Sequence, residues 1–216
     1  MPNADEIRDS QRATWAGLSA SWEKWDAVIV DQLSSVGAAM IEHLDIRDGQ
    51  QHLDVASGTG EPGLSIARLA PSGRVVLTDL AAEMLDVAAR RAKVQGFANV
   101  ETMVCSADDL PFSDGSFDSV SVRFGYMFFP DMDKATDEFV RVLKPGGRLC
   151  SSVWVKPEEN PWTPIAMEAI ATEVDVARPI QVVQTCSGAL LQVPSVPCTR
   201  MRGCTTLPSG RSTSSS

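Results

Sequence analysis

The chain has 216 residues, of which 44% are hydrophobic, and this length suits one α/β domain with a short extension. Its net charge of −9 argues against non-specific nucleic-acid binding, which needs a basic surface. Residues 1–10 lack the apolar centre of a signal peptide and no apolar run is long enough to span a membrane, so we expect a cytoplasmic protein. The cysteines show no metal-binding spacing, and Cys105 and Cys150 are expected to be small core residues.

Residues 7–44 have a largely helical pattern, and we assign residues 1–48 to an N-terminal helical cap. Trp15, Trp22 and Trp25 lie there at positions i, i+7 and i+10, among charged residues. This helical spacing favours a packing face over a ligand-binding surface, with both interpretations left open. A turn at 47–50 leads into a predicted strand at 51–56.

The most informative segment is residues 53–63, which read Leu-Asp-Val-Ala-Ser-Gly-Thr-Gly-Glu-Pro-Gly. It predicts a buried strand that ends in a glycine-rich turn and continues as a helix from Pro62. Gly58 and Gly60 carry no side chain, so a ligand can approach the backbone closely. The exposed amides at the helix start favour an electron-rich or negatively charged ligand, such as a nucleotide-type cofactor. An ordinary tight turn between a strand and a helix is the alternative.

Strands and helices alternate from this turn to Trp154. We predict helices at 62–69, 81–95 and 132–143, and strands at 74–78, 100–105, 117–122 and 148–154, with a turn at 144–147 before the last strand. This alternation predicts a doubly wound parallel sheet of the α/β class, in three α/β/α layers, over a domain of residues 49–175. Such sheets bind ligands at the carboxyl ends of their strands, where Gly58, Asp79, residues 106–109 and Arg123 fall.

Asp79 ends the second predicted strand about 20 residues after the glycine-rich turn, where an acidic side chain accepts hydrogen bonds from ribose hydroxyls. The alternative role is the N-cap of the helix that follows. Further along, the motifs Asp-Leu-Pro-Phe (109–112), Asp-Gly-Ser-Phe-Asp (114–118) and Arg-Val-Leu-Lys-Pro-Gly-Gly-Arg-Leu (141–149) occur in that order. Together with the turn and Asp79, they make residues 50–154 resemble the class I S-adenosylmethionine-dependent methyltransferases, in particular the ubiquinone/menaquinone type.

The resemblance implies a Rossmann-like fold and S-adenosylmethionine as the cofactor. It places the methionine part of the cofactor over the glycine-rich turn, the ribose on Asp79, the adenine against two apolar side chains and one backbone edge, and the methyl-transfer site beside Arg123. The implied cofactor-binding residues are Asp54, Gly58, Thr59, Gly60, Asp79, Leu80, Met84, Ser106, Ala107, Asp108 and Arg123.

Two of these positions carry alternatives. Relatives commonly have an acid at the position of Ser106, where it bonds the adenine amino group, and Asp108 or Asp109 could substitute for it. Arg123 could instead form a salt bridge at the rim of the core.

The resemblance also implies methyl transfer to a small, partly apolar acceptor molecule. Its binding pocket is expected between the N-terminal helices, the residues that follow the fourth strand and the segment after Trp154. The apolar side chains expected there are Tyr126, Met127, Phe128, Phe129 and Trp162. Attack in line on the sulfonium methyl depends mostly on placement, so a general base is optional. His52, within a strand, is expected to be structural, and His43 is a weak candidate base. No metal-ligand cluster is present in the sequence.

The composition changes at Val176, after which no Asp or Glu occurs. We assign residues 176–216 to an irregular tail, which is either a disordered polar segment or the product of a frameshift in a G+C-rich gene. The family completes its sheet with two more strands, which come from the region after Trp154, and we expect this chain to lack them. Two other functions stay open: a cofactor-binding protein with little or no turnover, and an NAD(P)-dependent oxidoreductase. The latter would need a catalytic Tyr/Lys pair or a His beyond the fourth or fifth strand, and the single tyrosine, Tyr126, has Pro130 in place of a lysine four residues on.

Overall fold

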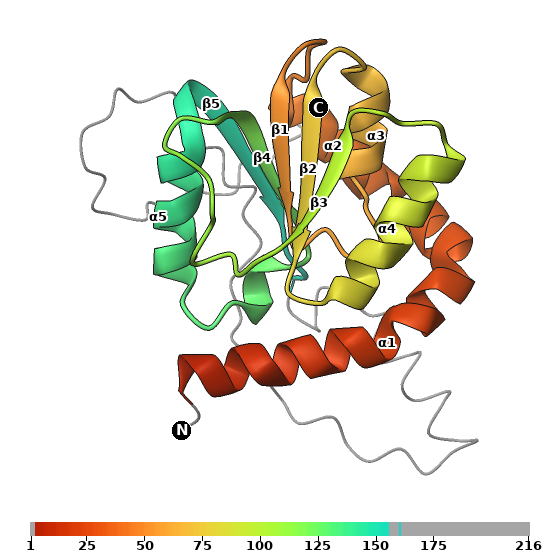
Figure 1. Cartoon of the computed structure of the whole chain (residues 1–216), viewed down its shortest axis with the longest axis vertical. Coiled ribbons are helices and arrows are strands. Elements are labelled where there is room, and N and C mark those ends of the chain that lie inside the picture. The colour runs from red at the N-terminus through yellow and green to blue at the C-terminus, as the bar shows by residue number, and fades with distance from the viewer. Residues whose placement is uncertain (1–2, 156–159, 161–216) are drawn as a thin grey trace, which may run out of the picture.

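The computed structural model of the protein describes residues 3–155 and residue 160. Its centre is a parallel sheet of five strands in the order β3-β2-β1-β4-β5. The strands are β1 (Gln51–Val55), β2 (Arg74–Asp79), β3 (Val100–Val104), β4 (Phe117–Arg123) and β5 (Leu143–Ser152). Helices cover both faces of the sheet, which confirms the predicted three-layer, Rossmann-like class (Figure 1).

Each face of the sheet has its own apolar core. Helix α5 (Met132–Val142) packs on one face, where Phe139 joins Val76 and Val120 of the strands. Helices α2 (Ser34–Leu44), α3 (Gly63–Leu69) and α4 (Ala82–Val94) pack on the other face, where their side chains join Val75 and Leu77. Neighbouring residues of β2 therefore serve opposite cores, as the period of two in a strand requires.

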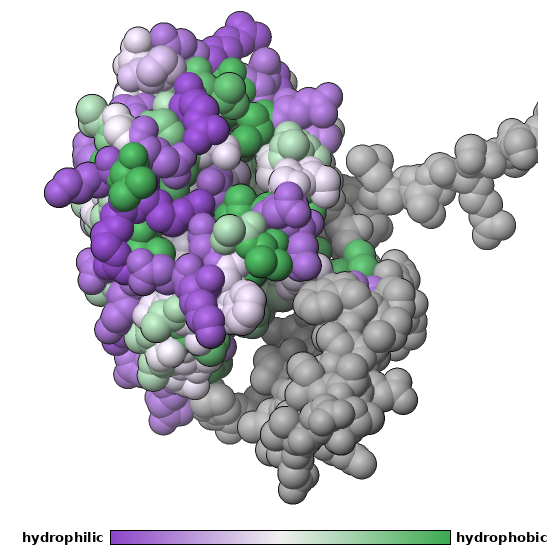
Figure 2. Space-filling model, turned by 90° about the vertical axis from the view of Figure 1, so that its right-hand side faces the viewer, coloured by the Kyte–Doolittle hydropathy of each residue, from purple (hydrophilic) through white to green (hydrophobic). Residues whose placement is uncertain are grey.

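Helix α1 (Ala4–Gln32) begins with a capping box formed by Asn3 and Glu6. It runs along the lower side of the sheet in Figure 1, and none of its residues is fully buried. The predicted helix at 7–44 is divided at Leu33, which joins α1 to α2. Figure 2 shows that hydrophilic side chains predominate on the side of the molecule that lies to the right in Figure 1, with hydrophobic residues scattered among them.

The last strand differs from its prediction at both ends. Leu143 already pairs with Phe117, and regular pairing resumes only between Ser119 and Arg148, so the predicted turn at 144–147 is an irregularity inside β5. Gly146 adopts φ 81° there, which favours glycine. The strand starts early, at Leu143, because residues 144–147 leave the ladder only briefly and the chain then pairs with β4 again. The strand then ends at Ser152 instead of Trp154.

Within the described part of the chain, no helix is both long and apolar enough to cross a membrane. The two cysteines of this part are free thiols, with Cys150 buried and Cys105 only partly so. The predictions for the tail at 176–216, and for the missing last strands, lie outside the described residues. The division into a cap of residues 1–48 and a domain of residues 49–175 stays a prediction.

Candidate functional site

A cavity of about 660 Å³ lies at the carboxyl edge of the sheet. Its lining comes from the ends of β1, β2 and β4, from the loops that follow β3 and β4, and from one side of α1. This is the position at which doubly wound sheets bind ligands. Most sequence-predicted site residues line the cavity, namely Gly58, Thr59, Asp79, Leu80, Met84, Ser106, Ala107, Asp108 and Arg123.

The glycine-rich turn connects β1 to α3, and the absence of a side chain serves a different purpose at Gly58 than at Gly60. A Cβ on Gly58, at φ 54°, would meet nothing within 4 Å, so the backbone there borders open space in the cavity. A Cβ on Gly60, at φ 110°, would lie 2.8 Å from Cδ1 of Leu64 and 3.3 Å from Cβ of Ala88. Gly60 is not among the lining residues, so its absent side chain serves packing against α3 and α4.

Asp54 lies beneath the turn, fully buried and outside the cavity lining. Its Oδ2 accepts the backbone N–H of Gly63 at 3.0 Å, and its Oδ1 accepts the hydroxyl of Ser121 at 2.5 Å. Burial raises the pKa of Asp54 to about 7, although these hydrogen bonds oppose the rise. The carboxyl group therefore secures the turn from below.

His52 extends this buried network. Its Nε2 lies 2.9 Å from the Ser121 hydroxyl and its Nδ1 lies 2.7 Å from the Ser119 hydroxyl. Burial lowers the pKa of His52 to about 3, so the ring is neutral at physiological pH. His52 is structural, as predicted. His43 bonds the carbonyl of Ala39 through Nδ1, at 2.7 Å, and does not line the cavity, so neither histidine is placed to act as a base.

Asp79 offers its carboxylate to the cavity. Oδ2 accepts the N–H of Gly58 at 3.0 Å and Oδ1 accepts the N–H of Ala81 at 2.9 Å. Burial raises the pKa of Asp79, and these backbone bonds oppose it. The predicted N-cap alternative is wrong, because Ala81 itself is the N-cap of α4. Each carboxylate oxygen has more than one lone pair, so both can still accept a ligand hydroxyl.

The region expected to hold adenine is tied to α1. Ser106 donates its hydroxyl to Oδ1 of Asp108, and Arg8 of α1 donates to Oδ2 of the same carboxylate at 3.1 Å. Asp108 is only 2% exposed, so a ligand amino group would have to share its oxygens with these partners. Asp109, the other suggested substitute, is exposed and does not line the cavity.

Arg123 combines a cavity position with a structural contact. Its Nε donates to the backbone carbonyl of Glu61 at 3.0 Å, which holds the end of the glycine-rich turn. Burial lowers the pKa of Arg123, while the nearby carboxylates of Asp54 and Glu61 favour its charged form. None of the ion pairs between described residues includes Arg123, so the predicted salt bridge is replaced by a bond to a carbonyl oxygen.

Aromatic rings form the opposite side of the cavity. Trp15 lies edge-on to Trp22 and to Phe128, at centroid distances of 6.1 and 5.4 Å. Phe124 stacks on Trp154 with centroids 4.2 Å apart and has φ 56°, an uncommon conformation for a bulky residue. The aromatic residues of the lining are Trp15, Trp22, Phe124, Phe128, Phe129 and Trp154.

The rings differ in part from expectation. Trp15 and Trp22 combine both interpretations left open, because they pack edge-on and also line the cavity, whereas Trp25 is 54% exposed. Tyr126 packs beside the apolar core under α5, donates its hydroxyl to the Met132 carbonyl at 3.1 Å, and does not line the cavity. Met127 is likewise absent from the lining, and Trp162 lies outside the described residues.

Sequence reasoning expected the N-terminal helices to border the acceptor, but it did not name Arg8 and Gln11 of α1, which line the cavity, and it also missed Ser57. The Ser57 hydroxyl is buried and has no hydrogen-bond partner among the described residues, so it is available to a ligand. Among the described residues, no group of three or more His, Cys, Asp or Glu side chains could hold a metal ion.

Comparison with known proteins identifies the family. The model of the ubiE/COQ5 methyltransferase family matches residues 15–173. The chain belongs to the ubiE/COQ5 methyltransferase family. This membership, with Tyr126 packed away from the cavity, removes the support for an oxidoreductase.

Two named relatives illustrate the match. The "Ubiquinone/menaquinone biosynthesis C-methyltransferase UbiE" of Hahella chejuensis is 43% identical over 119 residues, which is 54% of this chain and 48% of that protein. The "Demethylmenaquinone methyltransferase" of Thermus thermophilus is 45% identical over 97 residues, which is 45% of this chain and 44% of that protein. The chain thus spans about half the length of the curated relatives it matches.

Solved structures agree with the fold. The YcgJ protein of Bacillus subtilis superposes with a TM-score of 0.53 at 30% identity, over 62% of this chain and 55% of that one. A putative methyltransferase solved with the Haloferax volcanii Trm112 activator gives a TM-score of 0.62 at 21% identity, over 71% of this chain and 66% of that one, which is a likeness of fold alone.

The family implies S-adenosylmethionine as the cofactor, and the cavity fits that molecule. Gly58 leaves open space above the turn, Asp79 presents carboxylate oxygens that can accept hydroxyl groups such as those of ribose, and the Ser57 hydroxyl, which has no partner among the described residues, supplies a further polar group. Leu80 and Met84 add apolar surface next to Asp79.

Proposed function

We propose that this cavity binds S-adenosylmethionine and that the protein transfers its methyl group to carbon of a small, flat, quinone-type acceptor. The observation that carries the proposal is the Asp79 carboxylate, which is held by the N–H of Gly58 and faces a cavity of about 660 Å³. Relatives at 43% and 45% identity bear the names of a quinone C-methyltransferase and a demethylmenaquinone methyltransferase, which supports the acceptor class.

The residues of the chain have two tasks in this reaction. Asp79 binds the ribose hydroxyls and thereby fixes the cofactor along the carboxyl edge of the sheet. Trp15, Phe128 and Phe129 offer ring faces and edges to a flat acceptor. The cofactor supplies a methyl group on a positively charged sulfur, with a neutral thioether as leaving group. Because the leaving group is already good, holding the acceptor carbon in line can supply most of the acceleration.

A general base is not required of the histidines. His52 is buried in the sheet and His43 does not line the cavity. We therefore propose that catalysis depends mainly on positioning of the acceptor and on exclusion of water by α1 and the aromatic residues of the cavity lining. The acceptor loses its proton to solvent, or is already ionised when it reacts.

Binding of S-adenosylhomocysteine tests the cofactor part. Isothermal titration calorimetry on the full chain should give saturable binding, with none for NADH. Asp79→Asn keeps an acceptor for one backbone N–H but loses the charge, and should weaken binding about 10- to 100-fold, as expected for hydrogen bonds to a charged group. Asp86→Asn, on the exposed side of α4, is the control and should bind as the wild type does. Wild-type affinity in Asp79→Asn would contradict the proposed ribose site.

A cofactor-binding protein with little turnover is the second candidate, because the chain spans about half of its relatives and changes composition at Val176. The family match ends at residue 173, just before that change. Methyl transfer from labelled cofactor to a demethylated quinone separates the two functions. The frameshift interpretation of residues 176–216 stays a prediction that sequencing of the gene tests, as does the expected cytoplasmic location.

A further inference from the structure

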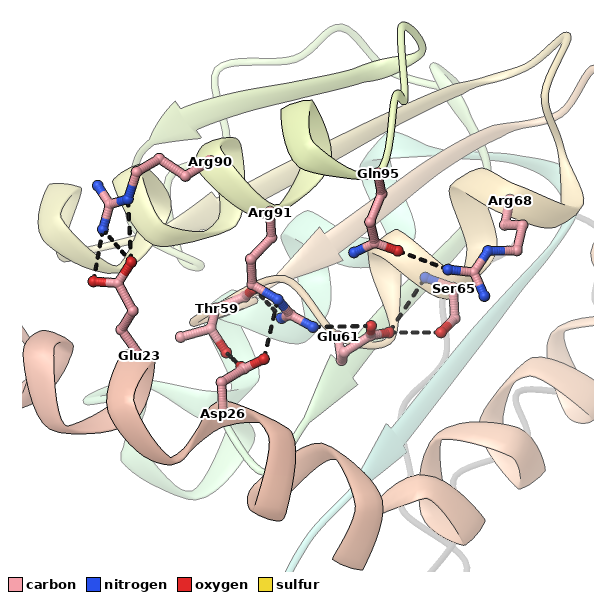
Figure 3. Close-up of polar contacts among 9 residues, drawn as sticks. All are labelled: Glu23, Asp26, Thr59, Glu61, Ser65, Arg68, Arg90, Arg91 and Gln95. Atoms are coloured by element: carbon pink, nitrogen blue, oxygen red, sulfur yellow. Dashed lines mark hydrogen bonds and ion pairs between the residues drawn. The ribbon is translucent and has the colours of Figure 1, made fainter.

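One guanidinium group joins helix α1 to the glycine-rich turn (Figure 3). The Nε of Arg91, on α4, lies 3.1 Å from Oδ2 of Asp26 on α1. Its Nη1 donates to the backbone carbonyl of Thr59, and its Nη2 lies 3.4 Å from Oε1 of Glu61. All three nitrogens of Arg91 therefore have partners, one on α1 and two on the turn.

Asp26 makes the same connection from the side of α1. Its Oδ1 accepts the hydroxyl of Thr59 at 2.9 Å while its Oδ2 faces Arg91. Thr59 is thus held at its hydroxyl by α1 and at its carbonyl by α4, and it lines the cavity. The neighbouring Gly58 is held at its N–H by Asp79. The conformation of the turn consequently depends on where α1 lies.

These contacts are better shielded from water than the other ion pair between described residues of α1 and α4. The side chains of Asp26, Arg91 and Glu61 are 18%, 19% and 14% exposed. The pair of Glu23 and Arg90 also joins α1 to α4, at 2.9 Å, but its side chains are 49% and 56% exposed and neither bonds the turn. Exposed pairs contribute little, whereas partly buried ones are less screened.

Helix α1 depends on such anchors because none of its residues is fully buried. It nonetheless supplies Trp15 and Trp22 to the cavity lining, so it forms a wall of the site without belonging to the core. A wall attached in this way can move when its polar contacts change.

We propose that Asp26 and Arg91 are positioning residues that couple closure of α1 over the cavity to the conformation of the glycine-rich turn. The inference rests on the proposed binding of S-adenosylmethionine in this cavity. A ligand that orders the turn presents Thr59 to Asp26 and Arg91 and so favours closed α1. By linkage, closed α1 retains the ligand.

The test is release of S-adenosylhomocysteine from the full chain, followed by tryptophan fluorescence after rapid mixing. Arg91→Gln and Asp26→Asn should each release the ligand about tenfold faster. Arg91→Lys should behave like Arg91→Gln, because an ammonium group cannot serve three separated partners in fixed directions. Glu23→Gln, the matched control on the same helix pair, should stay within about twofold of the wild type.

Hydrogen exchange gives a second readout that a merely structural role would not move. In the wild type and in Glu23→Gln, S-adenosylhomocysteine should slow amide exchange in residues 15–29 of α1. In Arg91→Gln this protection should be lost even when the protein is saturated with ligand. If Arg91→Gln does not fold, Thr59→Val carries the test, since it removes only the hydroxyl bond to Asp26 and should release the ligand about threefold faster.

The outcomes separate the two proposals. Equal release rates for Arg91→Gln and Glu23→Gln, or for Thr59→Val and the wild type, would overturn the coupling and leave cofactor binding intact. Ligand-independent exchange of α1 in the wild type would do the same. Absence of binding by the folded wild-type protein would overturn the proposed function, and the coupling with it.

Discussion

Replacing Asp54 by Asn should change how the stability of the protein depends on pH. Asp54 is buried beneath the glycine-rich turn, and burial raises its pKa from the ordinary 3.8 to about 7. A carboxyl group whose pKa is higher in the folded chain stabilises that state below pH 3.8, and the contribution is lost as the pH rises through about 7. The wild type should therefore lose stability relative to Asp54→Asn across this range, because only the wild type has the Asp54 carboxyl group to ionise.

The magnitude follows from the two pKa values. With 3.8 in the unfolded chain and about 7 in the folded one, ionisation of Asp54 removes about 2–3 kcal/mol of unfolding free energy between about pH 5 and pH 8. The amide introduced by Asp54→Asn can keep the buried network if the hydrogen bonds reverse their direction. Its N–H then donates to the hydroxyl of Ser121, and that hydroxyl donates to Nε2 of His52. His52 adopts the tautomer that carries its proton on Nδ1, which donates to Ser119. The backbone N–H of Gly63 keeps the amide oxygen as acceptor.

Urea unfolding followed by tryptophan fluorescence at several pH values measures the difference between wild type and Asp54→Asn. That difference should change by about 2–3 kcal/mol in favour of Asp54→Asn from about pH 5 to pH 8. His52, whose pKa is lowered to about 3, is present in both proteins, and its own contribution largely cancels. Asp86→Asn removes an exposed charge and should give a difference that is constant within about 0.5 kcal/mol. A flat difference for Asp54→Asn as well would refute the reasoning.

Two further predictions concern packing and thiol reactivity. Gly63→Ala should destabilise the protein by about 1–3 kcal/mol in chemical denaturation, because the added Cβ would lie 2.3 Å from a side-chain atom of Leu77. Gly17→Ala in α1, whose Cβ would meet nothing within 4 Å, should stabilise the protein by about 0.5–1 kcal/mol. Equal effects of the two substitutions would contradict the packing argument. Burial raises the pKa of Cys105 from 9.0 to about 11. Iodoacetamide at about pH 8 should therefore alkylate Cys105 about 100-fold more slowly in the native than in the unfolded protein, as measured by peptide mass spectrometry. Similar rates in the two states would show an accessible thiolate and contradict the prediction.

The features that were predicted correctly depend on near neighbours along the chain. Short apolar runs marked β1 and β2, and an amphipathic helical pattern marked α4; with flanking glycines, they gave bounds within one or two residues of those observed. The turn after β1 and the acidic residue at the end of β2 follow from chain direction, because all parallel strands end at the same edge. That geometry alone brings Gly58 and Asp79 to within 3.0 Å, although they are 21 residues apart.

The predictions that failed needed knowledge of which surfaces meet. Helical spacing correctly grouped Trp15 and Trp22, yet it could not say that the group faces a cavity. Gly60 fits a ligand-binding motif, but the reason for its missing side chain is Leu64 of the next helix. Tyr126 follows β4, where the acceptor wall was expected, but it packs against the core under α5.

By itself, the sequence of this protein determined the order of its elements, the parallel sheet and the position of the candidate site, because these follow from local periodicity and chain direction. Tertiary structure alone decided what surrounds the glycine-rich turn. The bonds of Asp26 to Thr59 and of Arg91 to the turn join residues 30 or more positions apart, and nothing in the sequence of either element indicates the other as its partner. The packing of the helices on the sheet decides which side chains become partners. Two charged side chains form an ion pair only when the packing of the apolar faces has brought their helices to the right distance.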